Sequence, residues 1–215
     1  MRKRFLLLTL LLFAAPAPAA LRTILVLGDS LSAGYGIELR ADWVSLLQKR
    51  LERQGYPYRV INASISGDTT SSGRERLPAA LDRHRPEIVI IELGANDGLR
   101  GLALSQMRAN LAAMISTARR HGARVLLVGM YLPPNYGKPY TEKFHQIFRD
   151  LAREYKLPLV PFLLAGVALK PDLMQSDGLH PRAPAEPRVL DNVWRELQPM
   201  LLAPGAARKR LSARK

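Results

Sequence analysis

Four short segments, far apart in the chain, carry residue types that together suit acyl transfer. Such a site needs a nucleophile, a base that takes its proton, a carboxylate that orients the base, and donors for the negatively charged oxygen of the intermediate. In chain order the segments are Gly28-Asp29-Ser30-Leu31-Ser32, Ser66-Gly67-Asp68, Gly94-Ala95-Asn96-Asp97 and Asp177-Gly178-Leu179-His180. Each segment alone is a weak signal, but all four in one chain indicate a serine hydrolase.

Ser30 and His180 are the predicted nucleophile and base. Ser30 follows an apolar run through a glycine and an aspartate, so a tight turn can present its hydroxyl, although it could instead cap the next helix. Of the four histidines, His180 has Asp177 three residues before it in an irregular loop. That spacing lets the carboxylate accept from Nδ1 and leaves Nε2 to face the serine. The alternative is an Asp–His pair that only fixes the loop.

The other three histidines are expected to have structural roles. His84 and His121 end predicted helices, and His145 lies within a predicted helix as a surface or packing residue.

Three donors are predicted for the oxyanion: the N–H of Ser30, the N–H of Gly67 and the side-chain amide of Asn96. Gly67 has no side chain to block its backbone, and Asn96 follows a strand that would hold its amide in place. One such donor is typically worth about a hundred- to a thousandfold in rate. A turn glycine and an Asx-turn are the alternatives.

Apolar runs alternate with stretches of helical period along the chain. Strands are predicted over 23–27, 59–62, 87–93, 125–128 and 159–161, and helices over 43–51, 74–84, 104–121, 144–151 and 189–197. Strands that are apolar throughout are typical of a parallel sheet covered on both faces. We therefore predict a single α/β domain, a three-layer α/β/α sandwich with a five-stranded parallel sheet in the flavodoxin-like order 2-1-3-4-5. The first and third strands are then neighbours, which brings Ser30 and Asn96 together at the carboxyl edge.

The two ends of the chain differ in composition from the domain between them. Residues 1–19 combine a basic start, an apolar run over 5–15 and Ala17-Pro18-Ala19, which predicts a signal peptide and a periplasmic or secreted protein. The run is too short to span a bilayer, and an uncleaved anchor is the alternative. The hydrolase domain is expected over 20–204. The basic segment 205–215 is expected to be a disordered tail, either simply solvated or in weak contact with anionic lipid.

The composition of the chain argues against several classes of function. The chain has 215 residues and no cysteine, which excludes thiol catalysis and thiolate metal sites. Its formal net charge is +14, of which the basic start and the tail together account for eight. The tail contains no aromatic residue, so nucleic-acid binding is not expected. We expect no metal, no cofactor and a monomer.

The four segments resemble the conserved blocks of the GDSL, or SGNH, hydrolase family. The family's functional residues fall on Ser30, Gly67, Asn96 and His180, with Asp177 as the triad acid. Residues 62–70, 91–101 and 132–137 resemble the bacterial periplasmic branch of thioesterase I, lysophospholipase and arylesterase, and the resemblance covers 24–201. An α/β-hydrolase would need Gly-x-Ser-x-Gly, which residues 28–32 lack. The chain has Arg182 where the family commonly has asparagine.

This resemblance implies activity on acyl thioesters, lysophospholipids and aryl esters. Loops at the same edge of the sheet carry apolar residues that suit an acyl chain or aryl group, unless they only pack on one another. The predicted substrate-binding residues are Leu99, Leu102, Tyr131, Pro133, Pro134 and Tyr136. Two alternatives remain: an O-acetyl esterase of the same fold acting on carbohydrate or cell wall, and an exported lipid-binding protein without chemistry.

Overall fold

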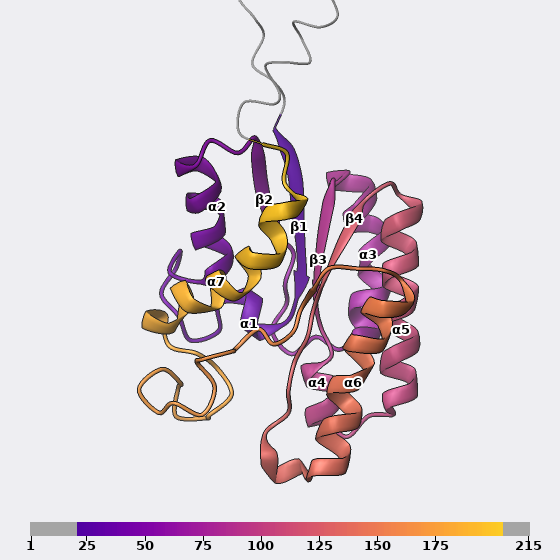
Figure 1. Cartoon of the computed structure of the whole chain (residues 1–215), viewed down its shortest axis with the longest axis vertical. Helices are drawn as coiled ribbons and strands as arrows, with labels where there is room; N and C mark the ends of the chain where they lie inside the picture. The colour runs from indigo at the N-terminus through magenta and orange to yellow at the C-terminus, as the bar shows by residue number, and fades with distance from the viewer. Residues whose placement is uncertain (1–20, 204–215) are drawn as a thin grey trace, which may run out of the picture.

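The computed structural model describes residues 21–203, which form three layers around one parallel sheet (Figure 1). The sheet has the order β2-β1-β3-β4-β5, and every neighbouring pair is parallel. The strands are β1 Arg22–Gly28, β2 Tyr58–Asn62, β3 Ile88–Glu92, β4 Arg124–Val128 and β5 Leu159–Val160. The predicted fold class and strand order are therefore confirmed.

Helices cover both faces of this sheet (Figure 1). The pair α2 and α7 covers one face, and α3, α5 and α6 cover the other. Their bounds are α1 Ser30–Ala33, α2 Trp43–Arg53, α3 Thr70–His84, α4 Ala95–Leu99, α5 Leu104–Arg120, α6 Lys138–Glu154 and α7 Glu186–Leu197, with short 3-10 turns at Pro134–Tyr136, Ala183–Ala185 and Gln198–Met200. None of the helices between residues 21 and 203 has the length and apolar composition needed to cross a bilayer.

The two central strands are apolar because helices bury both of their faces. Every residue of β3 is buried, as are all residues of β1 except the first. Gly28 at the end of β1 is paired in register with Glu92 at the end of β3. The segments that leave these two strands therefore start side by side, which places the Ser30 and Asn96 regions at one edge.

Five helices differ from the prediction, one of them α7, which begins at Glu186 rather than at Val189. The short helices α1 and α4 were not predicted, because four or five residues carry no helical period. Helix α3 begins at Thr70, where Thr69 and Ser72 form a capping box, and α6 begins at Lys138 with a proline in its first turn. The start of α3 is set by this capping box, which precedes the apolar pattern, whereas α6 begins directly after Gly137 without a side-chain cap. The predicted signal peptide and the basic tail lie outside the described residues.

Candidate active site

Ser30 is the first residue of α1, and its hydroxyl is not used to cap that helix. Asp29 is the N-cap, and its Oδ1 accepts the N–H of Leu31 at 3.1 Å. The alternative interpretation of Ser30 as a capping residue is thus wrong. Gly28 makes the tight exit from β1 possible, because a Cβ at this position would lie 2.7 Å from Glu92 Oε2 and from the Ser32 side chain.

The Ser30 hydroxyl meets the ring of His180. His180 Nε2 lies 2.8 Å from Ser30 Oγ, and His180 Nδ1 lies 2.7 Å from Asp177 Oδ2. Both distances are those of good hydrogen bonds. The structure therefore brings together three side chains that the sequence separates by up to 150 residues, in the order carboxylate, imidazole, hydroxyl.

Asp177 also shapes the loop that carries His180. Its Oδ1 accepts the backbone N–H groups of Leu179 and His180 at 2.9 and 3.0 Å. Partial burial acts to raise the pKa of Asp177, but the hydrogen bonds from the His180 ring and these two N–H groups outweigh it and lower the pKa below its ordinary value. The lowered pKa keeps the Asp177 carboxylate ionised at a pH at which the His180 imidazole can accept a proton.

A second set of contacts folds the loop back on itself. Met174 and Pro181 form an antiparallel bridge, and Gln175 N–H donates to His180 O at 2.7 Å. The side-chain amide of Gln175 donates to Pro181 O and to Tyr35 O, at 2.9 and 2.8 Å. Arg182, the departure from the family pattern, donates from Nε to Met174 O at 2.8 Å. Arg182 is therefore an anchor of the loop.

The three predicted donors differ in the hydrogen bonds that they already make. Gly67 has φ of +83°, a conformation that favours glycine. Within residues 21–203, the N–H groups of Ser30 and Gly67 have no hydrogen-bond acceptor. Asn96 Nδ2, in contrast, donates to Asp68 O at 2.9 Å and to Asp29 Oδ2 at 3.1 Å. A substrate oxygen would therefore compete with Asp29 for one amide hydrogen.

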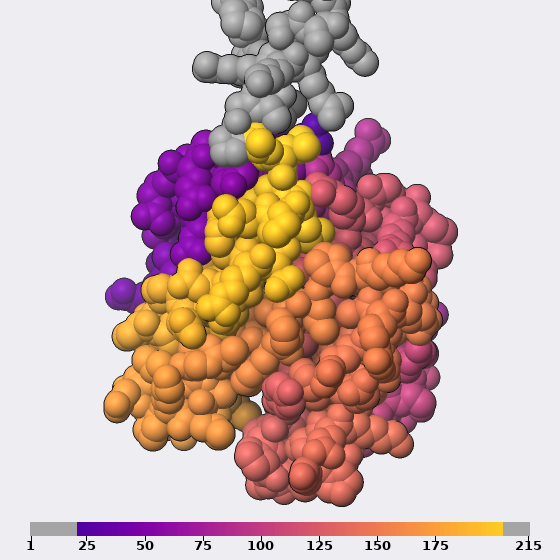
Figure 2. Space-filling view, viewed as in Figure 1, coloured from indigo at the N-terminus to yellow at the C-terminus, as the bar shows by residue number. Residues whose placement is uncertain are grey.

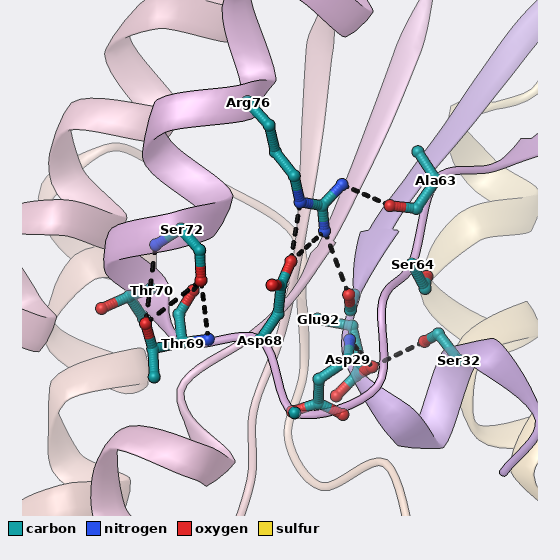
Figure 3. Close-up of polar contacts among 12 residues, drawn as sticks. Asp29, Ser32, Ala63, Ser64, Asp68, Thr69, Thr70, Ser72, Arg76 and Glu92 are labelled. Carbon is teal, nitrogen blue, oxygen red and sulfur yellow. Dashed lines mark hydrogen bonds and ion pairs between the residues drawn. The ribbon is translucent and has the colours of Figure 1, made fainter.

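A polar layer that the sequence did not reveal lies behind these donors (Figure 3). Arg76, on α3, donates from Nε to Asp68 Oδ2 at 2.7 Å and from its two terminal nitrogens to Ala63 O and Gly28 O. It therefore connects the Gly67 loop to the end of β1. No local pattern points to Arg76, because all of these partners are distant in sequence or lie on the backbone.

Glu92 is the other buried member of this layer (Figure 3). Its Oε2 accepts the N–H of Asp29 at 3.3 Å and the hydroxyl of Ser32 at 2.6 Å. Burial raises the pKa of Glu92 well above its ordinary value, and the charge of Asp29 adds to this. Burial also raises the pKa of Asp29. Because two buried carboxylates this close repel each other, a proton on one of them favours the fold.

Asp97 fixes the helix that carries Asn96. Its carboxylate accepts the N–H and the hydroxyl of Thr70, at 2.8 and 2.5 Å. Asn110 in turn donates to the Thr70 hydroxyl at 3.2 Å. These buried bonds hold α4 against the start of α3, and so set the position of the Asn96 amide.

Two neighbouring cavities lie at this edge of the sheet, and the smaller one contains Ser30 in its wall. The smaller, of about 120 Å³, contains Ser30, Asn96 and His180 in its wall. The larger, of about 520 Å³, has a mostly apolar wall formed by the loops after β4 and β5, and Figure 2 shows a hollow at this lower edge of the molecule. The two cavities share the wall residues Tyr131, Leu132, Pro133, Leu164 and Leu179. An apolar chain on Ser30 can therefore extend into the larger cavity.

The sequence matches a known family over this whole arrangement. The model of the GDSL-like lipase/acylhydrolase family matches residues 26–185, from β1 to beyond His180. The chain belongs to this family. The predicted resemblance is confirmed, and so is the predicted enzyme class, a carboxylic ester hydrolase.

Several relatives are similar to this chain over most of its length. Esterase TesA of Pseudomonas aeruginosa is 54% identical over 85% of this chain and 91% of its own length. An arylesterase of Vibrio mimicus is 46% identical, over 90% and 97% of the two chains. Thioesterase 1/protease 1/lysophospholipase L1 of Escherichia coli is 45% identical over 92% of each. A crystal structure of TesA superposes with a TM-score of 0.82 at 53% identity, covering 84% of this chain and 100% of that one.

Of the six predicted substrate-binding residues, four line one or both of the cavities and two do not. Leu99 lines the smaller cavity, Pro134 lines the larger, and Tyr131 and Pro133 line both. Leu102 and Tyr136 line neither cavity. The Tyr136 hydroxyl instead donates to Leu99 O at 3.0 Å.

Of the two roles expected for His145, surface or packing, the structure shows packing, because the side chain is buried. Its ring stacks on Tyr131 with centroids 3.7 Å apart, and its Nδ1 lies 3.0 Å from Met130 O. His145 therefore supports a wall that both cavities share. His84 and His121 lie at the ends of α3 and α5 as predicted. Residues 21–203 hold no cluster of three or more His, Asp or Glu side chains arranged for a metal ion.

Proposed function

We propose that the protein hydrolyses acyl esters and thioesters through an acyl-enzyme on Ser30. The observation that carries this proposal is the pair of hydrogen bonds at His180, 2.8 Å to Ser30 Oγ and 2.7 Å to Asp177 Oδ2. His180 Nε2 takes the Ser30 proton while Oγ attacks the carbonyl carbon, and Asp177 stabilises the imidazolium.

The oxyanion that forms is bound by the N–H groups of Ser30 and Gly67 and by the Asn96 amide. Support comes from the two backbone N–H groups, which lack an intramolecular acceptor, and from the amide, which Asp68 O already orients. The two backbone donors need no rearrangement at the moment of reaction, whereas the Asn96 amide exchanges its bond with Asp29 Oδ2 for one with the oxyanion.

Two bond cleavages complete the cycle. His180 returns its proton to the alcohol or thiol as the C–O or C–S bond breaks. A water molecule, deprotonated by His180, then attacks the acyl-enzyme, and the acid leaves as Ser30 regains its proton. These steps use only the side chains and the backbone described above.

The substrate class follows from the cavities. The acyl part lies in the apolar cavity of about 520 Å³, with Tyr131, Pro133 and Pro134 in its wall, and Leu99 borders the reacting end. The leaving group lies toward solvent near Tyr35, whose ring centroid is 4.6 Å from that of His180. Aryl esters, acyl thioesters and lysophospholipids satisfy these conditions, in keeping with the names of the relatives.

Export and assembly are further parts of the proposal. The basic start, the apolar run and Ala17-Pro18-Ala19 support secretion to the periplasm with cleavage after Ala19. We propose that the mature protein acts as a monomer, because all three catalytic side chains come from one chain.

A substrate panel tests the proposed activity. Purified protein and a Ser30→Ala variant are assayed on acetyl, octanoyl and dodecanoyl aryl esters, on acyl-CoA thioesters, on a lysophospholipid and on an acetylated sugar. The expected result is hydrolysis of the acyl esters and thioesters by the parent and its loss in Ser30→Ala. Hydrolysis confined to the acetylated sugar, or full activity in the variant, contradicts the proposal.

A further inference from the structure

Most of the exposed apolar side chains lie in segments that follow the carboxyl ends of the strands, the edge of the sheet that carries Ser30. Eight large apolar side chains are exposed among residues 21–203. One of them, Leu21, precedes β1 at the opposite edge of the sheet. The other seven follow the carboxyl ends of the five strands and form what we call the apolar rim: Tyr35, Leu39, Ile65, Leu102, Tyr131, Tyr136 and Leu169.

Two rim leucines are exposed far beyond what folding explains. Leu39 is 91% exposed and Leu169 is 78% exposed. Leu169 also has φ of +64°, a left-handed conformation that is unfavourable for an L-residue with a bulky side chain. Outside helix ends, the described non-glycine residues with positive φ are Leu169 and Arg40, beside Leu39. An exposed leucine in a strained conformation adds nothing to the fold, which points to a partner outside the molecule.

Exposed cations are interleaved with these apolar residues. Arg40 follows Leu39 directly, and Lys170 follows Leu169 directly. Two further pairs, Tyr136 with Lys138 and Arg100 with Leu102, are separated by one residue. Exposed acids on the same segments, namely Glu38, Glu142, Asp172 and Asp177, are fewer than the cations, which also include Lys143 and Arg182.

This alternation matches the chemistry of an anionic lipid surface. Apolar side chains enter the boundary between headgroups and acyl chains, while neighbouring lysines and arginines reach the phosphates. The larger cavity opens within the same rim, because Tyr131 and Leu169 are both exposed and both line it. A surface that contacts lipid here therefore places the cavity mouth against the layer that holds acyl chains (Figure 2).

We propose that the apolar rim docks on an anionic phospholipid surface and lets an acyl chain pass from that surface into the larger cavity without crossing water. Docking is a property of the rim alone, whereas the transfer step rests on the proposed function. The occupant is a lipid layer rather than a protein, because the rim consists of separate side chains with cations beside them, and two of its members, Tyr131 and Leu169, line a cavity with a mostly apolar wall.

Vesicle sedimentation tests docking without any turnover. The Ser30→Ala protein, which leaves the lipids intact, is mixed with vesicles of phosphatidylcholine, with and without phosphatidylglycerol. Leu39→Ser is compared with the matched control Leu21→Ser, which removes an exposed leucine from the opposite edge. Because one buried leucine is worth about 1.5–3 kcal/mol, we expect Leu39→Ser to weaken partitioning roughly tenfold or more. Leu21→Ser should leave it unchanged.

Several results would overturn docking by the rim. Equal partitioning of Leu39→Ser and the parent is one, and equal losses in both leucine variants is another. Deleting residues 205–215 separates the rim from the basic tail. If this deletion removes all binding while Leu39→Ser has no effect, the tail alone holds the lipid and the proposal fails. Equal partitioning on vesicles with and without phosphatidylglycerol would also contradict it, because the rim cations should favour anionic lipid.

The variant Leu169→Asn tests whether weaker partitioning onto vesicles could result from unfolding of the protein. Asparagine adopts left-handed backbone more readily than leucine, so the variant should keep or raise the melting temperature while its partitioning falls roughly tenfold. Unchanged partitioning contradicts the proposal.

Activity separates a failure of docking from a failure of the proposed function. With Ser30 present, Leu39→Ser should match the parent on a monomeric acetyl ester, since Leu39 lines neither cavity. On lysophospholipid in anionic vesicles it should be slower by roughly the same factor as its loss of partitioning. A parent that binds vesicles through the rim but hydrolyses neither substrate refutes the function and leaves docking intact. Equal rates on vesicles, despite weaker binding, refute the transfer step.

Discussion

Arg76 lies 2.6 Å from the carboxylate of Asp68, the residue directly after Gly67. The same guanidinium bonds the carbonyl of Gly28, two residues before Ser30, at 3.2 Å. The carbonyl of Asp68 accepts from Asn96 Nδ2 at 2.9 Å. One side chain on α3 therefore fixes the relative positions of the three backbone segments that supply the proposed oxyanion donors.

Replacing Arg76 should lower the rate of the chemical step. Arg76→Gln removes the ion pair with Asp68 and leaves Gly67 N–H and Asn96 less fixed, so kcat should fall roughly ten- to hundredfold. KM should stay within about threefold, because Arg76 lines neither cavity. Arg76→Lys should give an intermediate kcat, since an ammonium replaces the charge but not the fork of donors.

A surface arginine provides the control for Arg76. Arg108 pairs with Glu154 between α5 and α6, with both side chains about half exposed. Arg108→Gln should keep the kcat of the parent, because such pairs contribute little. If Arg76→Gln lowers the melting temperature but leaves kcat of the folded protein unchanged, then Arg76 only stabilises the fold.

Asp177 should be needed for the rate of catalysis and not only for the conformation of the loop that carries His180. In Asp177→Asn the side-chain oxygen can still accept the backbone N–H groups of Leu179 and His180, but the tautomer and the charge stabilisation of the imidazole are lost. We expect kcat to fall roughly a hundred- to ten-thousandfold with an unchanged melting temperature. Parental kcat in this variant would show that the Asp177–His180 pair only holds the loop.

Filling the larger cavity should shorten the preferred acyl chain. Ala168 lines this cavity and not the smaller one, so Ala168→Phe should reduce kcat/KM for a dodecanoyl ester roughly tenfold or more. Acetyl ester hydrolysis should change little. Ala109→Phe, at an exposed position of α5, is the matched control. An unchanged chain-length profile in Ala168→Phe would place the acyl chain elsewhere.

Glu186 should make stability fall as pH rises. Its Oε2 accepts the N–H of Trp43 at 2.6 Å, and burial raises its pKa to about 8 from an ordinary 4.5. Between these values the folded state holds a proton that the unfolded state releases, so raising the pH favours unfolding. Glu186→Gln removes this effect. Its gain in unfolding free energy over the parent should grow from pH 5 to pH 8, at up to about 1.4 kcal/mol per pH unit, and level off above.

Denaturant unfolding at pH 5, 7 and 9 measures this gain. A constant difference between Glu186→Gln and the parent would mean that Glu186 titrates normally in the fold.

The sheet and the contact between Ser30, His180 and Asp177 could be predicted because their signals are local. Apolar runs give each strand within a residue or two, and Asp177 precedes His180 at a spacing that fits one hydrogen bond. The strand order then followed from the general rules of parallel sheets. Ser30 and His180 were expected together on chemical grounds, since neither would function alone.

The supporting groups could not be predicted, because their partners are distant in sequence. Glu92 ends an apolar strand, and its contacts with Asp29 and Ser32 depend on β1 and β3 being adjacent. Arg76 bonds backbone carbonyls, which have no sequence signature. The sequence left His145 open between a surface and a packing role, because its burial depends on Tyr131, which lies in the loop after β4. The exposure of Leu39 and Leu169 likewise needs the folded chain.

Covalent labelling by an aryl phosphonate ester tests the central claim, that His180 activates Ser30 as the nucleophile. Mass spectrometry of digested protein locates the adduct and follows its rate of formation. We expect one adduct on the Ser30 peptide, formed roughly a hundredfold or more slowly in His180→Ala and absent in Ser30→Ala. An adduct on another residue, or the same labelling rate without His180, would contradict the account.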